Sequence, residues 1–404
     1  AVASMLYLDY GKNDGEWVAN MYGGNENLEA VEFLKHLNSV FKGRKDGAVL
    51  IAEESTAWPM ITGNPKDGGL GFDYKWNMGW MNDFTNYMRC DPYFRKNNYG
   101  GLTFSMLYAY SENFILVFSH DEVVHGKGSM MGKMPGENLE KKAENLRAAY
   151  GFMMSHPGKK LLFMGQDFGQ IDEWNENASL EWELLQYPLH KNMQSYVRAL
   201  NHMVLEHPAL YEEDFDPSGF EWINCSYHEE SMVLYVRRSK DGKETLLFIC
   251  NFDNVEHEKF RLGVPFAGKY KEIFNSDARE FGGQGRINAR AKSSKKIPWD
   301  DRENSIECNI PPMSFLVFSC TPEAGKKKAG RAAKSSVKEA AAKKEPETGG
   351  RKTAVMKEEP KKLSTAREEP KKLFTTKEEP KKIVEVKSRE RTQKTVQSFK
   401  RTES

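Results

Sequence analysis

The sequence is poor in cysteine, and its cysteines follow no metal-binding or disulfide pattern. Among 404 residues there are five cysteines, and no two of them form a Cys-x-x-Cys pair. An odd, scattered set argues against a disulfide framework and against a zinc site, and it favours a reducing compartment. We therefore expect a cytoplasmic protein.

Long apolar runs are also missing. No run approaches the roughly 20 residues that a membrane-spanning helix needs, and no basic segment leads into an apolar one as in a secretion signal. We accordingly expect no membrane partner. The sequence also lacks a glycine-rich phosphate-binding loop, which argues against a nucleotide-binding fold.

The net charge of +1 hides a strong asymmetry. Residues 321–404 hold 25 Lys and Arg against 13 Asp and Glu, which leaves the remainder with 34 and 45. Within this segment the motif EEPKK recurs at Glu358, Glu368 and Glu378, and each repeat has too few apolar residues to build a core. We predict a disordered Lys/Glu/Pro-rich tail that acts as a solvated spacer. Its partner is unknown; the Glu-Lys alternation and scarce aromatics argue against nucleic acid.

The first half of the chain alternates between buried-strand and helix patterns. Apolar runs at 48–52, 114–118 and 160–164 each lead into polar residues, and segments 28–41, 140–154 and 196–207 have helical spacing. This pattern is typical of βα units around a parallel sheet. Long loops after the strands favour an α/β fold in which residues 1–213 form the second half of a (β/α)8 TIM barrel. A doubly wound sheet is the alternative.

Two segments of this half read differently. The chain begins in a helix-like pattern, and residues 1–7 are expected to lead away from the end of a preceding strand. Residues 56–82 suggest a long loop rich in Gly, Trp and Tyr.

Beyond residue 214 the pattern changes to short apolar runs separated by Gly, Asp and Asn turns. The runs lie at 220–223, 232–236, 245–249, 270–273 and 314–318. They predict an antiparallel β-sandwich over residues 214–320.

Carboxylates follow all three predicted parallel strands: Glu53 and Glu54, then Asp121 and Glu122, then Asp167. Because carboxyl ends of such strands meet at one mouth of a barrel, these groups are expected to converge. Glycoside cleavage uses such a set, with one carboxyl protonated and another ionised. A helix N-cap at Asp121 and a metal site remain alternatives.

Several motifs carry a family resemblance: IAEEST, FDYKWNMGWMND, FSHDEVVHGK, KKLLFMGQDFGQ, ASLEW and DFDPSGFEWI. Over residues 1–319 the chain resembles the second half of the glycogen (1,4-α-glucan) branching enzymes of the α-amylase family. The resemblance implies a (β/α)8 barrel, a C-terminal β-sandwich and no metal or organic cofactor. It also implies that α-1,4-glucan or glycogen chains are cut and rejoined through α-1,6 bonds with retention.

The resemblance assigns catalytic roles. Glu53 matches the general acid/base, Asp121 matches the carboxylate that stabilises the transition state, and His120 matches a substrate-binding histidine. The family's nucleophilic Asp would stand just before Ala1, so we expect this chain to lack it and to be inactive by itself.

Three further residues are candidates for binding substrate. His125 follows the same motif, although a satisfied core histidine is an equal alternative. Trp58 would be a platform on which a sugar stacks. Asp167 stands where many relatives have Glu, and its shorter side chain puts the usual contact in question.

Other prominent residues have structural explanations. Glu54 neighbours Glu53 and so points elsewhere, which favours a structural salt bridge. Glu122 would be a helix-start charge. For Trp76 and Trp80 we favour a place in the core over stacking on sugar.

Two other functions stay open from the sequence. One is a glucan hydrolase of the α-amylase family, and the other is a non-catalytic glucan-binding protein.

Overall fold

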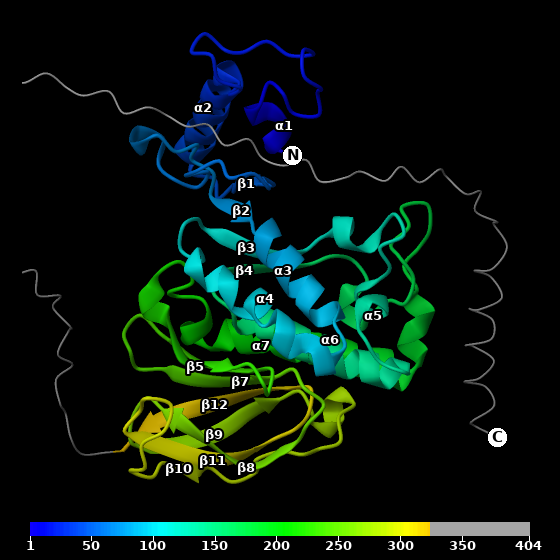
Figure 1. Cartoon of the computed structure of the whole chain (residues 1–404), viewed down its shortest axis with the longest axis vertical. Coiled ribbons are helices and arrows are strands. Elements are labelled where there is room, and N and C mark those ends of the chain that lie inside the picture. The colour runs from blue at the N-terminus through cyan, green and yellow to red at the C-terminus, as the bar shows by residue number, and fades with distance from the viewer. Residues whose placement is uncertain (324–404) are drawn as a thin grey trace, which may run out of the picture. The chain divides into compact units, whose positions relative to one another are not determined.

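A computed structural model describes residues 1–323 (Figure 1). The predicted tail lies outside the described residues except for its first three positions. Within this described part, no helix is both long and apolar enough to cross a membrane.

A four-stranded parallel sheet forms the centre of the first half. Its strands are β1 (Ile51–Ala52), β2 (Tyr74–Trp76), β3 (Phe114–Phe118) and β4 (Lys159–Leu162). They pair in chain order, each parallel to the next. Every residue of β3 is buried, as expected of a strand covered on both faces. The sheet confirms the predicted series of βα units.

Helices pack beside this sheet (Figure 1). Asparagine side chains cap three of the longer ones: Asn27, Asn77 and Asn138 each accept a backbone N–H from the first turn. The helices are α1 (Ala3–Leu6), α2 (Leu28–Arg44), α3 (Met78–Arg89), α4 (Gly100–Thr103), α5 (Met130–Lys133), α6 (Leu139–Ser155) and α7 (Pro188–Glu206). The three predicted helices are present, and all three are longer than predicted.

One prediction for this half is wrong and another is confirmed. The first residues form the short helix α1, in line with their helix-like pattern. The predicted loop over 56–82 contains strand β2 and the start of α3. The strand escaped prediction because Lys75 interrupts its apolar pattern, and this charge is tolerated because Lys75 pairs with Glu54 at 2.7 Å.

The second half is antiparallel β structure, as predicted. A six-stranded sheet has the order β10-β9-β12-β7-β6-β5, and a separate pair joins β11 to β8. The strands are β5 (Phe220–Tyr227), β6 (Met232–Arg238), β7 (Thr245–Asn251), β8 (His257–Val264), β9 (Gly268–Asn275), β10 (Lys292–Ser293), β11 (Asn304–Ile310) and β12 (Ser314–Pro322).

The sequence patterns missed β8, β10 and β11. In β8 exposed charged residues, Glu258 and Lys259, break the apolar pattern. Strand β12 continues two residues past the predicted boundary at 320, and the domain boundaries themselves stay predictions.

The central strands of the six-stranded sheet separate two hydrophobic cores. In β6, Val233 and Tyr235 belong to the core shared with the helices, whereas Leu234 and Val236 belong to the core inside the sandwich. Since successive side chains of a strand point to opposite faces, each strand contributes alternately to both cores. The sandwich therefore also forms one wall of the helical layer.

Buried charges also join the two halves. The carboxylate of Asp214 lies 2.8 Å from Arg237 Nη2 and 2.8 Å from Lys159 Nζ, and Arg237 also donates to the backbone oxygen of Ser155 at 2.8 Å. Burial raises the pKa of Asp214, but the attraction of Lys160 and Arg237, with Lys159, outweighs it and lowers the pKa below 3.8.

We expect Asp214→Asn to reduce the free energy of unfolding by roughly 3–5 kcal/mol at pH 7, because it leaves the buried Arg237 without its counter-charge. Since the folded-state pKa is depressed, the carboxylate's contribution is complete above about pH 3.8 and is lost as the pH falls through the folded value. The difference between variant and wild type should therefore shrink on acidification.

Urea unfolding at a series of pH values measures this difference. Asp241→Asn, which removes a carboxylate from an exposed pair with Lys243, is the matched control and should leave the midpoint unchanged. Equal stability of Asp214→Asn and wild type at pH 7 would contradict the assignment.

Candidate active site

Two consecutive carboxylates at the end of β1 have different environments. Glu54 is buried, lies 2.7 Å from Lys75 Nζ and accepts the backbone N–H of Thr56 at 2.7 Å. The predicted structural salt bridge of Glu54 is thus confirmed. Glu53 points to the other face of the strand, where its side chain is 40% exposed.

Glu53 lies against the first residues of the chain. The backbone N–H of Val2 donates to the backbone oxygen of Glu53 at 2.8 Å, and the amino nitrogen of Ala1 lies 3.3 Å from Glu53 Oε2. In a longer polypeptide this nitrogen would be a peptide nitrogen.

The second pair of candidates follows β3 in the short helix η4 (His120–Val123). The Ser119 hydroxyl accepts the backbone N–H of Asp121 at 3.3 Å and caps this turn. His120 Nε2 lies 3.3 Å from Asp121 Oδ1, and both side chains are partly exposed. Glu122 stands in the first turn, as predicted, but it is buried and faces Lys127 at 3.8 Å.

The parallel sheet brings these groups to one edge. Glu53 follows β1 and Asp121 follows β3, with β2 between the two strands. Carboxyl ends of parallel strands face the same way, so both carboxylates lie where the predicted barrel mouth would be.

Two aromatic rings pack against His120. Its ring centroid lies 5.7 Å from that of Phe163 and 6.5 Å from that of Trp174, and the latter two rings meet edge-to-face at 5.0 Å. Phe163 and Trp174 come from the segment after β4, so side chains that follow two neighbouring strands fix one face of the imidazole.

His125 is exposed, so a core position for it is wrong. Its backbone has φ +58°, in the left-handed region that few non-glycine residues adopt. Asp167 lies in η5 (Gln166–Phe168) after β4 and is partly buried.

Trp58 is partly buried and packs edge-to-face on Tyr7 at 5.4 Å. It also lines a cavity of about 620 Å³ between the segment after β1 and the start of α3. Trp80 is fully buried, which confirms its predicted core position. Trp76 is partly buried: it packs against the core and also lines the same cavity.

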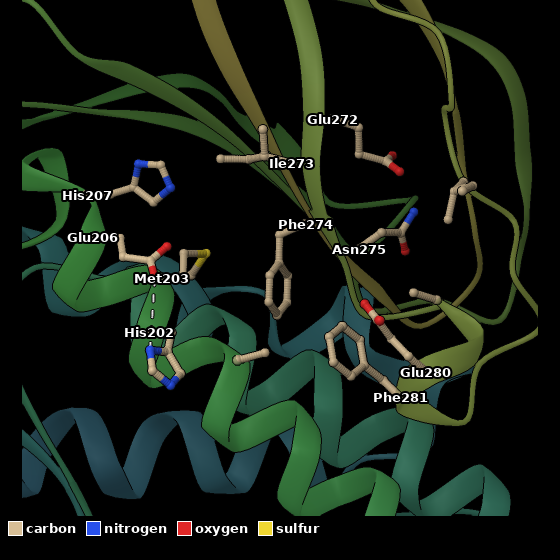
Figure 2. Close-up of a pocket in the computed structure, with 13 residues that line it drawn as sticks. His202, Met203, Glu206, His207, Glu272, Ile273, Phe274, Asn275, Glu280 and Phe281 are labelled. Carbon is tan, nitrogen blue, oxygen red and sulfur yellow. Dashed lines mark ion pairs between the residues drawn. The ribbon is translucent and has the colours of Figure 1, made fainter.

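A second cavity, of about 510 Å³, lies between α7 and β9 (Figure 2). His202, Glu206, Glu272 and Glu280 contribute to its lining, but none of the predicted site residues does. It is therefore separate from the candidate site.

Within residues 1–323, no group of three or more His, Cys, Asp or Glu side chains is arranged to hold a metal ion.

Sequence reasoning missed two charged residues beside the candidate loop. Lys133 and Glu173 both bond to its backbone between residues 122 and 128. Neither stands in a recognisable motif, and only the folded turn brings them to the residues that follow Asp121.

Comparison with known proteins gives a consistent set of relatives. Residues 222–321 match the family described as alpha amylase, C-terminal all-beta domain. The chain is 50% identical over 318 residues to the 1,4-alpha-glucan branching enzyme GlgB of Halothermothrix orenii, covering 79% of this chain and 50% of that protein. It is 52% identical over 317 residues to GlgB of Aquifex aeolicus, covering 78% and 50%. The chain thus spans about half the length of these curated relatives.

A crystal structure of AmyP in complex with maltotriose also resembles the chain. The TM-score is 0.51 at 11% sequence identity, and the match covers 72% of this chain and 62% of AmyP. At this identity the match shows a common fold.

We expect Glu54→Gln to lower the free energy of unfolding by roughly 3–5 kcal/mol, because Lys75 would stay buried without a counter-charge. Glu53→Gln is the matched control on the neighbouring residue and should leave the urea midpoint almost unchanged, since Glu53 is partly exposed. Equal midpoints for the two variants would contradict the division of roles at the end of β1.

Proposed function

We propose that this chain carries part of the active site of a 1,4-alpha-glucan branching enzyme, the group of curated proteins that it matches at about 50% identity. The intact protein would cut an α-1,4-glucan and transfer the released chain to a 6-hydroxyl, forming an α-1,6 branch. Its partners would be α-1,4-glucan or glycogen chains.

The contact between the amino end and Glu53 carries the proposal. The amino nitrogen of Ala1 lies 3.3 Å from Glu53 Oε2, and the family resemblance puts the nucleophilic Asp at the position before Ala1. Retaining glycosidases need a nucleophile and an acid/base about 5–5.5 Å apart. The backbone pairing of Val2 with Glu53 would hold two such carboxyls side by side.

The reaction would proceed in two displacements. In the first, the preceding Asp attacks the anomeric carbon, the bond from that carbon to O4 breaks, and Glu53 gives its proton to the departing oxygen. In the second, Glu53 takes the proton of an acceptor 6-hydroxyl, whose oxygen bonds to the anomeric carbon and releases the Asp.

Asp121 and His120 would bind the sugar at the reacting centre. The Asp121 carboxylate accepts hydrogen bonds from sugar hydroxyls and stabilises the positive charge that develops in the oxocarbenium-like transition state. The imidazole of His120, held by the rings of Phe163 and Trp174, would donate to a neighbouring hydroxyl. Trp58, His125 and Asp167 would contact more distant parts of the glucan.

We also propose a cytoplasmic location. Its support is that all five cysteines are free thiols, three of them buried.

We expect Glu53→Gln to lower branching by the intact protein about 10²–10⁴-fold, because it removes the proton donor. Asp121→Asn should lower it by about 10²–10³-fold through lost stabilisation of the transition state. His202→Ala, in the separate cavity of Figure 2, is the control and should keep wild-type activity.

Counting α-1,6 linkages formed on amylose, together with new reducing ends, measures both transfer and hydrolysis. New reducing ends without α-1,6 linkages would point to a hydrolase. Glucan binding by wild type without turnover would point to a binding protein.

A further inference from the structure

The loop that follows Asp121 has an unusual backbone. Three of four consecutive residues have positive φ: His125 at +58°, Gly126 at +80° and Gly128 at +75°. Left-handed residues in a tight turn direct several backbone N–H groups into one concavity, which attracts an anion. A non-glycine residue in this conformation persists only where surrounding contacts hold it.

Glu173 supplies the anion from the segment after β4. Its two carboxylate oxygens accept the backbone N–H groups of Gly126, at 3.1 Å, and of Gly128. Burial raises the pKa of Glu173, but these two donors, with Lys133 and His125 nearby, outweigh it and lower the pKa below its usual value. The group is therefore a carboxylate at neutral pH, as the turn requires.

Lys133 holds the same loop through its carbonyl groups. Its Nζ donates to the backbone oxygens of Glu122, Lys127, at 2.8 Å, and Gly128, at 2.6 Å. An ammonium has three protons to donate, so these bonds use all of them. Burial lowers the pKa of Lys133 to about 8, which leaves it charged at neutral pH.

The base of Lys133 is itself fixed. The three methionines around it in sequence, Met130, Met131 and Met134, are all buried in the main core. Charged groups that face its ammonium are Glu122 and Glu173, which attract it, and Arg89 and Lys127, which repel it. The Lys133 ammonium thus reaches the loop from an anchored element rather than from a mobile surface chain.

Together these contacts constrain the backbone beside Asp121. Ser119 holds the N–H of Asp121, and Lys133 holds the carbonyl of Glu122, so the catalytic residue lies between two fixed groups. We propose that Lys133 and Glu173 are positioning residues that hold the loop after Asp121 and thereby fix its carboxylate and His120 toward the sugar. The catalytic part of this inference rests on the proposed function.

Hydrogen exchange measures the loop directly in this chain. In Lys133→Met and in Glu173→Gln, we expect backbone amides of the peptide covering residues 119–129 to exchange about tenfold faster than in wild type, because local opening becomes easier. Lys127→Met is the matched control. It removes a half-exposed ammonium of the same loop that lies 3.8 Å from Glu122 and, among the described residues, donates no hydrogen bond to a backbone oxygen, so exchange should not change. Unchanged exchange in both Lys133→Met and Glu173→Gln would overturn the inference.

Kinetics of the intact protein test the catalytic part. Since Asp121 acts in the transition state, a misplaced loop should lower kcat about 10- to 100-fold in Lys133→Met, with KM within about threefold. Glu173→Gln keeps one acceptor oxygen and should lie between this variant and wild type.

The outcomes separate the two proposals. Faster exchange with wild-type kcat in both variants would overturn the positioning role. If exchange is faster in the variants but the wild-type protein forms no α-1,6 linkages, Lys133 and Glu173 hold the loop but the branching function is rejected. If Lys133→Met does not fold, the milder Glu173→Gln decides by the same measurements.

Discussion

The fold depends on burying α6 on two sides at once. One side of this helix belongs to the core around β3, and the other packs on the six-stranded sheet, where Gly151 meets Phe315. A Cβ at Gly151 would stand 2.3 Å from Phe315 Cγ, so only glycine permits this approach. Every residue of α6 from 145 to 155 is buried, and a helix segment covered all round is a central element rather than a surface one.

The buried part of α6 also contains polar side chains, and these hydrogen-bond to groups on other elements. Asn145 accepts from buried Arg95 at 2.6 Å, and Arg147 donates to the backbone oxygen of Ser276 at 3.1 Å. Burial lowers the pKa of Arg95 to about 10, which still leaves it charged at neutral pH. Each polar side chain therefore ties α6 to another element, because an unpaired buried polar group would be destabilising.

The sequence predicted those strands whose burial can be inferred from their own residues. Apolar runs marked β3, β6 and β7, since strands covered on both faces need few polar residues. Strand β2 was hidden because its central Lys75 is neutralised by a residue more than twenty positions away. Local patterns cannot show such a partner.

The candidate site divides in the same way. Carboxylates after each strand could be read from the chain, because their place depends only on the strand's end. The bonds of Lys133 and Glu173 could not, because they depend on backbone groups turned outward by left-handed residues. Distances between residues of different loops cannot be predicted from local sequence patterns.

Strand alternation at β1 explains why one of two adjacent carboxylates is free for chemistry. Leu50 and Ala52 pack into a small core with α2, and Glu54 continues that face toward Lys75. Val49 and Ile51, each about half exposed, lie on the opposite face with Glu53. A shift of one residue would exchange the two faces. It would bury Glu53 against Lys75 and bring Glu54 to the open side. The Glu54–Lys75 ion pair therefore also determines that Glu53 is the carboxylate on the open face.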